Sequence, residues 1–208
     1  HFGRGVRRTL CVLATGTGKT VVAGYIARQR ASLGRMMFVA HRFELLEQAA
    51  DKLRSITGLR VDVEQAERRA DESSLFGKAP IVVASVQTLN SGNRMERFDP
   101  KEFATLICDE VHHYTSTTYR RVFKYFEYIP TIGLTATPDR HDEEALGQLF
   151  DSVAYDYEII DAVLDGWLVP ILQRRIHLKG LDLSNVRTTA GDLNAGDLEK
   201  AIRANETL

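Results

Sequence analysis

The chain has 208 residues, of which 44% are hydrophobic and 26% are charged, and its formal net charge is −1 at pH 7. This length and composition suit one domain with a sizeable core and a small appendage. A net charge this close to zero excludes a positive electrostatic potential over the whole chain, so any contact with nucleic acid would depend on a local basic patch. No apolar run reaches bilayer-spanning length, and the N-terminus lacks a signal-peptide pattern. We therefore expect a soluble protein with no membrane partner.

The two cysteines, Cys11 and Cys108, both lie in apolar segments that are predicted to be strands. Small buried thiols of this kind are typical of a reducing compartment, which predicts a cytoplasmic location. The chain begins with His1 instead of Met and stops at Leu208 without a capping signal. We therefore expect it to be part of a longer protein.

Short apolar segments alternate with helical patterns, which predicts an α/β domain with a mostly parallel sheet. Strands are predicted at 9–14, 35–40, 79–84, 105–108, 131–134 and 153–157. Helices are predicted at 19–32 and 44–55, where Gly34 and Gly58 are the expected C-terminal caps. Most of the strands are continuous apolar runs, which indicates that helices cover both faces of the sheet. The segment 180–208 is polar and only weakly periodic, which favours a connection over a core element.

A glycine-rich loop, ATGTGKT, occupies residues 14–20 between the first predicted strand and the first predicted helix. Glycines let such a loop turn its N–H groups toward phosphate oxygens at the positive end of the helix. We interpret it as a P-loop that binds ATP through Gly16, Thr17, Gly18, Lys19 and Thr20. Lys19 would reach the terminal phosphates, and the Thr20 hydroxyl would be a ligand of Mg²⁺. Leu13 stands where the usual pattern has its first glycine. A plain surface turn is the alternative, which the flanking elements disfavour.

Two acidic residues, Asp109 and Glu110, directly follow the predicted strand at 105–108. The carboxyl ends of parallel strands form the ligand-binding edge of such sheets. Asp109 is expected to bind Mg²⁺, and Glu110 is expected to be the general base that activates the attacking water, with Lys19 as the other catalytic residue. A solvated acidic turn is the alternative. A zinc site at His112 and His113 is disfavoured because no metal-ligand spacing surrounds them.

Four segments resemble motifs of superfamily 2 helicases, in the order in which that family has them. Residues 39–42 (VAHR), together with Leu45 and Gln48, resemble motif Ia, and 84–89 (ASVQTL) resemble motif Ib. Residues 109–112 (DEVH) resemble the DExH box, and 133–138 (GLTATP) resemble motif III. With the P-loop as motif I, the resemblance covers about residues 8–170. Within the superfamily, these motifs most resemble those of the branch with restriction-enzyme motor subunits, such as the type III restriction enzyme Res subunit.

This resemblance implies a RecA-like P-loop NTPase fold and further site residues. Thr135 and Thr137 would link the nucleotide site to a strand-binding surface, and His112 would sense motif III or a neighbouring domain. The alternative for the two threonines is that their hydroxyls cap the next helix.

Three more residues would contact the phosphate backbone of a nucleic acid: His41, Arg42 and Thr88. Such contacts carry no base information, so sequence-independent binding is expected. For Arg42 the alternative is an ordinary solvated residue.

The resemblance implies an ATP-dependent helicase or translocase, a Mg²⁺-dependent ATPase that moves along DNA or, as the alternative, RNA. Residues 1–172 would be the first RecA-like domain and 173–208 a connection toward a second one, with other subunits as further partners. The adenine-reading segment would precede Val6. Because the second domain would supply an arginine finger, the isolated domain should bind nucleotide but hydrolyse it poorly. A nucleic-acid-binding switch that never translocates and a small-molecule P-loop kinase are the competing hypotheses.

Overall fold

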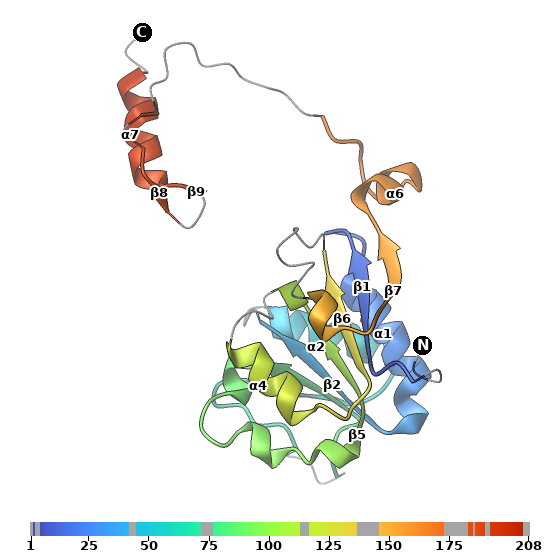
Figure 1. Ribbon diagram of the computed structural model, residues 1–208. Helices are drawn as coiled ribbons and strands as arrows, with labels where there is room; N and C mark the ends of the chain where they lie inside the picture. Colours follow the sequence, from blue (N-terminus) through green and yellow to red (C-terminus); the bar gives the residue numbers. More distant parts are fainter. Residues whose placement is uncertain are drawn as a thin grey trace. The chain divides into compact units, whose positions relative to one another are not determined.

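A computed structural model describes residues 2, 5–41, 45–71, 77–112, 117–136, 146–172, 183–184, 186–189 and 192–205. The chain divides into two compact units, residues 1–169 and 170–208. The first unit contains a seven-stranded sheet, shown in Figure 1. The second unit contains a short antiparallel ribbon and one helix, β8 (Thr188–Thr189), β9 (Asp192–Leu193) and α7 (Ala195–Asn205).

The sheet of the first unit has the strand order β3-β4-β2-β5-β6-β1-β7, and every pairing in it is parallel. Its strands are β1 (Arg8–Leu13), β2 (Arg35–Ala40), β3 (Val61–Glu64), β4 (Ile81–Ser85), β5 (Phe103–Cys108), β6 (Thr131–Thr135) and β7 (Ser152–Tyr157). All five residues of β4 and five of the six in β2 are buried, as expected for strands that helices cover on both faces. The predicted parallel α/β fold is confirmed.

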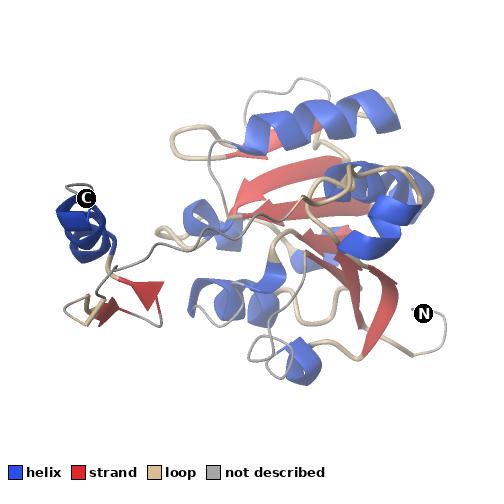
Figure 2. Ribbon diagram, turned by 90° about the horizontal axis from the view of Figure 1, so that it is seen from above, coloured by secondary structure: helices blue, strands red, loops and turns tan. Residues whose placement is uncertain are grey.

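Helices pack on both faces of the sheet, as Figure 2 shows from above. One apolar cluster joins the sheet to α1 (Lys19–Arg30) and α2 (Leu46–Thr57), and a second joins it to α3 (Val86–Leu89) and α4 (Thr117–Tyr125). The first unit also contains a helical segment at 146–149, α6 (Ile159–Leu164) and the short 3-10 turns η2 (Ala31–Leu33), η4 (Met95–Arg97) and η5 (Pro100–Glu102). None of the helices in the described ranges is long and apolar enough to cross a membrane.

Several elements were not predicted from the sequence, and β3 is the clearest case. This edge strand carries Asp62 and Glu64, which interrupt the apolar pattern. Glu64 is nevertheless completely buried, because Arg94 and Arg97 pair with its carboxylate and the N–H of Ala70 donates to it. The helices α3, α4 and α7 were also missed.

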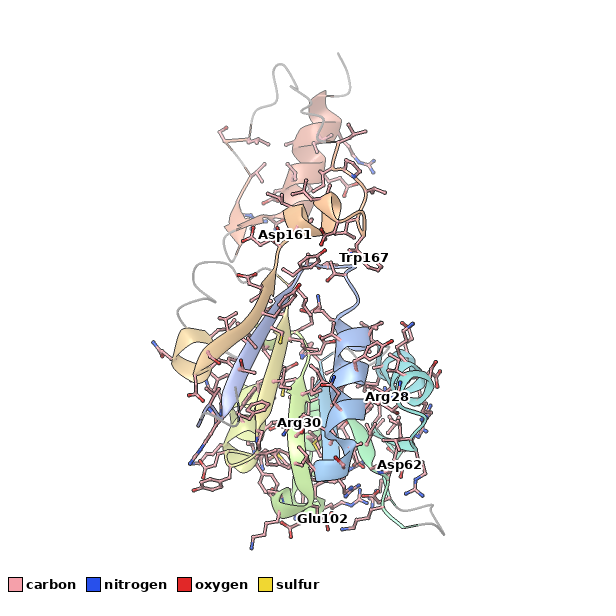
Figure 3. The ribbon with its side chains drawn as sticks, turned by 90° about the vertical axis from the view of Figure 1, so that its right-hand side faces the viewer. Arg28, Arg30, Asp62, Glu102, Asp161 and Trp167 are labelled. Atoms are coloured by element: carbon pink, nitrogen blue, oxygen red, sulfur yellow. The ribbon has the colours of Figure 1, made fainter. Side chains whose placement is uncertain are left out.

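The carboxyl ends of the strands form the edge of the sheet that matters for function. Figure 3 places Trp167 and Asp161 at this end of the first unit, and Glu102, which precedes β5, at the opposite end. The loops after β1 and β5 therefore leave the sheet on the same edge, since all strands run in parallel. The glycine-rich loop and the acidic pair are brought to one place by this topology.

Gly133 in β6 leaves room for the ring of Phe150, so we expect Gly133→Ala to destabilise the fold. An added Cβ would lie 2.5 Å from Cζ of Phe150 and 3.0 Å from Cγ2 of Val111. The ring cannot easily retreat, because it is buried and packs edge-to-face against Phe123. Chemical denaturation should show a free energy of unfolding about 1–3 kcal/mol lower, the usual penalty for overpacking.

The matched control is Gly147→Ala, because an added Cβ there meets no atom within 4 Å. Gly147 lies in the helical segment at 146–149, so this second substitution should leave stability unchanged or raise it by up to about 1 kcal/mol, since alanine has the higher helix propensity. Equal stability of the two variants would contradict the packing described for Gly133.

Candidate nucleotide-binding site

The glycine-rich loop turns between β1 and α1 through left-handed backbone at two glycines. Gly16 has φ 87° and Gly18 has φ 88°, a region that side-chain-bearing residues rarely adopt. The Thr17 hydroxyl donates to the Ala14 carbonyl at 2.6 Å, which ties the loop to the end of β1. Any Cβ on Gly16 would also lie 3.2 Å from Cδ2 of Leu168. The two glycines are therefore required by the backbone path.

The helix α1 begins at Lys19 and presents its positive end to the loop. The first N–H groups of a helix have no partner within the helix, and they carry a partial positive charge. The first turn of α1 contains no acidic residue that would neutralise this charge. The loop and helix start thus have the geometry that favours an anion such as a phosphate.

A cleft of about 530 Å³ opens beside this loop. The predicted residues that line it are Gly16, Gly18, Lys19, Thr20, Asp109 and Glu110. Thr17 belongs to the loop but does not line the cleft. The far wall comes from α2 and includes Gln48 and Lys52. The structure thus brings the P-loop lysine, the hydroxyl and both acids to one cavity.

The cleft also contains a lysine that the sequence interpretation missed. Lys52 follows Leu45 and Gln48 at helical spacing, and all three line the cleft. That spacing is the signal that could have identified Lys52, because residues three to four apart share one helix face. The exposed Lys52 adds a second positive charge to a cavity suited to phosphate.

The two acids differ in their surroundings. Burial and the neighbouring Glu110 charge raise the pKa of Asp109 to about 6. A divalent cation beside this carboxylate would favour its ionised form, because an opposite charge within a few ångströms lowers a carboxyl pKa. Oε1 of Glu110 lies 3.6 Å from Nζ of Lys19, so the acid pair already faces the P-loop lysine.

Glu110 adopts an unusual backbone conformation, with φ 50°. Its second oxygen, Oε2, lies 3.3 Å from Nδ1 of His112, yet it is buried and has no hydrogen bond within the described part of the protein. Nδ1 of His112 also lies 3.2 Å from Oγ1 of Thr135. The acidic turn and the end of β6 are therefore in direct contact, as the coupling hypothesis for His112 and Thr135 requires.

The residues predicted to contact nucleic acid lie at the ends of β2 and β4. His41 follows β2, and its Nδ1 lies 3.0 Å from the side-chain amide of the exposed Gln87. Thr88 is only 8% exposed, and its hydroxyl accepts a hydrogen bond from the N–H of Ala66. Arg42 and Thr137 lie outside the described residues. Gln87, which the sequence interpretation did not single out, is the more accessible neighbour of His41.

The two cysteines play no visible part in this site. Both are buried free thiols, and burial raises the pKa of each above its usual range. Within the described ranges, no group of three or more His, Cys, Asp or Glu side chains is arranged to hold a metal ion. A magnesium site of the P-loop type needs no such group, because a hydroxyl, one carboxylate, phosphate oxygens and water complete it.

Comparisons with known proteins identify the family and the fold of the chain. Residues 1–140 match the family model described as type III restriction enzyme, res subunit. The chain is 30% identical to a protein of Saccharomyces cerevisiae named as a candidate ATP-dependent helicase, IRC3, over 98% of this chain and 31% of that protein. It is 27% identical to the Escherichia coli type I restriction enzyme EcoAI endonuclease subunit, over 95% of this chain and 25% of that protein.

A solved structure supports the fold. The helicase domain of Pyrococcus furiosus Hef superposes with a TM-score of 0.61 and 25% identity, over 72% of this chain and 34% of that one. The chain spans a third or less of the length of the curated relatives described above. The RecA-like fold that the motifs predicted is confirmed, and the chain belongs to the family of the type III restriction enzyme res subunit.

Proposed function

We propose that this chain is the ATP-binding motor domain of a nucleic-acid helicase or translocase. The observation that carries the proposal is the convergence of Lys19, Thr20, Asp109 and Glu110 on one cleft at the carboxyl edge of the sheet. Membership in the restriction-enzyme family and similarity to proteins named as helicases support the same conclusion. ATP is the proposed substrate, with its phosphates on the loop at residues 14–20.

Thr20 and Asp109 are the residues that would hold Mg²⁺. The fit is supported by their positions, since both line the cleft and Asp109 is a carboxylate with a raised pKa beside a second acid. Bound magnesium would neutralise charge on the phosphates. Lys19 would contribute a positive charge to the terminal phosphates, and the first N–H groups of α1 would bind their oxygens.

Glu110 is the proposed general base. Its carboxylate would accept a proton from a water molecule in the cleft, with Oε1 near Lys19 and Oε2 near His112. His112 and Thr135 would couple the nucleotide site to the strand-binding surface through the contact of Nδ1 with Oγ1 at 3.2 Å. Thr137 is proposed for the same role by its place in motif III.

The polymer that this motor follows is proposed to be DNA, with RNA as the alternative outcome of the test. His41, Arg42 and Thr88 would form part of the surface for one strand, through contacts to phosphates. We further propose that a second RecA-like domain completes the ATPase site, and that other subunits join it. The cytoplasmic location stays a prediction.

The competing proposal is a switch that binds nucleic acid in response to nucleotide but never moves along it. Both proposals need the same cleft, so only turnover separates them. A motor should hydrolyse ATP continuously when a strand is present, whereas a switch should hydrolyse it once per binding event.

The test is the steady-state ATPase rate of the full-length protein with single-stranded DNA, duplex DNA and RNA. We expect at least one of the polymers to raise kcat by about tenfold or more, which corresponds to about 1.4 kcal/mol of transition-state stabilisation. A rate that stays the same with all three would contradict the motor proposal and leave only a nucleotide-binding site.

Arg42→Ala should weaken strand binding to a similar extent for every base sequence. A phosphate contact carries no base information, and its loss should reduce the salt slope by about 0.7 per phosphate on single strands. Fluorescence anisotropy across several oligonucleotides and salt concentrations would measure both effects. The control is Arg28→Ala, an exposed arginine in the last turn of α1, seen in Figure 3. Affinity lost only at certain bases would show that Arg42 reads sequence instead.

A further inference from the structure

The peptide between Asp109 and Glu110 is held by contacts that no motif predicts. The Glu110 N–H donates to Oδ1 of Asp109 at 3.1 Å. One residue earlier, the Asp109 N–H donates to the Val39 carbonyl at 2.8 Å, which continues the pairing of β5 with β2. The Asp109 carbonyl accepts a hydrogen bond from the hydroxyl of Tyr119 at 3.0 Å. Tyr119 comes from α4 and is completely buried. One tyrosine hydroxyl therefore holds the carbonyl of the peptide that precedes Glu110.

The orientation of this peptide decides where the Glu110 carboxylate points. With φ 50°, Glu110 occupies left-handed backbone, which residues other than glycine adopt only when their surroundings hold them there. Rotation of the preceding peptide would change this angle, and the side chain would swing with it. In the observed orientation, the Glu110 carboxylate lies 3.6 Å from Lys19 and 3.3 Å from His112.

The ring of Tyr119 stacks on His41, which belongs to the predicted nucleic-acid-binding surface. Its centroid lies 6.4 Å from that of His41, with 22° between the two planes. His41 in turn contacts the exposed Gln87, whose Oε1 accepts a hydrogen bond from the Ser85 hydroxyl. Tyr119 is thus in contact with both the acidic turn and the residue that follows β2.

An ordinary core tyrosine would also need a partner for its buried hydroxyl. That requirement explains why a hydrogen bond exists, but any nearby carbonyl would satisfy it. The bond instead goes to the peptide whose rotation controls an unfavourable φ at the proposed general base. Tyr125 of the same helix illustrates the ordinary case, because its hydroxyl donates to the Phe98 carbonyl at 3.0 Å, away from the cleft.

We propose that Tyr119 is a positioning residue that fixes the Asp109–Glu110 peptide, aims the Glu110 carboxylate into the nucleotide cleft and connects it to His41. This role rests on the proposed function, because Glu110 is the general base only if the cleft hydrolyses ATP. Tyr119 itself need not touch the nucleotide.

The first test compares Tyr119→Phe with Tyr125→Phe in the full-length protein. Each substitution removes one hydroxyl that donates to a backbone carbonyl, and both come from α4. Tyr119→Phe should lower the strand-stimulated kcat by about tenfold and leave KM for ATP within about twofold, since the phosphate contacts remain. Tyr125→Phe should change neither constant. Because Tyr119 is completely buried and Tyr125 only partly, the stability of both variants is measured first, and the rates are compared at a temperature where both are folded.

The second test does not depend on hydrolysis. A crystal structure of the Tyr119→Phe protein should show Glu110 with φ below zero and its carboxylate withdrawn from Lys19. An unchanged positive φ, or an unchanged kcat in an active protein, would overturn the proposal for Tyr119. If the wild-type protein has no ATPase activity with any polymer, the proposed function fails, and the structure of the variant still decides whether Tyr119 fixes this peptide.

Discussion

Lys19→Ala should reduce the affinity for Mg²⁺–ATP by about 100-fold or more and leave the fold intact. Hydrogen bonds to charged groups are worth about 1.5–3 kcal/mol, and two or more such bonds from one ammonium to the terminal phosphates would be lost together. The side chain contacts Glu110 across the cleft and is not a member of either apolar cluster. Isothermal titration calorimetry would measure the affinity, and circular dichroism the retained fold.

The matched control for this prediction is Lys52→Ala. Lys52 lines the same cleft from α2, so its removal subtracts the same charge without touching the loop. We expect a loss of affinity below about tenfold, because an exposed lysine contributes mainly a screened long-range attraction. Equal losses for Lys19 and Lys52 would mean that general charge, and not the P-loop geometry, binds the phosphates. Unchanged affinity in Lys19→Ala would remove the P-loop assignment.

Glu110→Gln should have the opposite pattern, with nucleotide binding retained and turnover lost. Glutamine matches the shape of the side chain but cannot accept the proton of the attacking water. General-base catalysis is worth about 10²–10⁴-fold, so kcat should fall by that factor. The affinity for Mg²⁺–ATP should stay within about threefold, because the phosphate and metal contacts come from other residues.

The measurement for Glu110→Gln is a pair of assays on the same full-length preparation. Single-turnover hydrolysis gives the chemical rate, and equilibrium titration gives the affinity. A variant that hydrolyses ATP at the wild-type rate would show that the general base lies elsewhere. A variant that no longer binds nucleotide would assign Glu110 to the binding of the phosphates or the metal.

Much of the site was predictable because its chemistry is encoded locally. The loop at 14–20 needs glycines where φ is positive, and Gly16 and Gly18 stand at those positions. The acids follow a buried strand, and parallel topology then places both segments at one edge. These inferences use only neighbours in sequence and a rule about sheets, so a single sequence is sufficient for them.

The rest of the site depends on packing between distant segments. Tyr119 contacts Asp109 only because α4 packs against the sheet. The residues around Tyr119 in the sequence do not indicate that its hydroxyl donates to the Asp109 carbonyl. Lys52 joins the cleft because α2 lies beside α1. Such contacts are set by the tertiary structure, and periodicity in one helix can show a shared face but not what that face meets.

Buried polar groups are also hard to predict from the sequence, because their partners come from distant segments. The apolar pattern does not predict β3, because its Glu64 becomes acceptable in the core only through Arg94 and Arg97, about thirty residues away. Thr88 was predicted to contact nucleic acid, but its hydroxyl accepts a hydrogen bond from the N–H of Ala66, in the turn after β3. Its contact with nucleic acid stays a prediction, with Gln87 as the more exposed side chain in the same motif.

The central claim is that ATP hydrolysis in this cleft drives movement along a nucleic acid. The measurement that tests it most directly is the ATP-dependent displacement of streptavidin from biotin-labelled ends of DNA and RNA, with excess free biotin as the trap. The full-length wild-type protein should displace streptavidin from at least one end, and Glu110→Gln should not, although it still binds both ATP and the strand. A wild-type protein that hydrolyses ATP and binds the strand, yet displaces no more streptavidin than Glu110→Gln, would contradict the motor account.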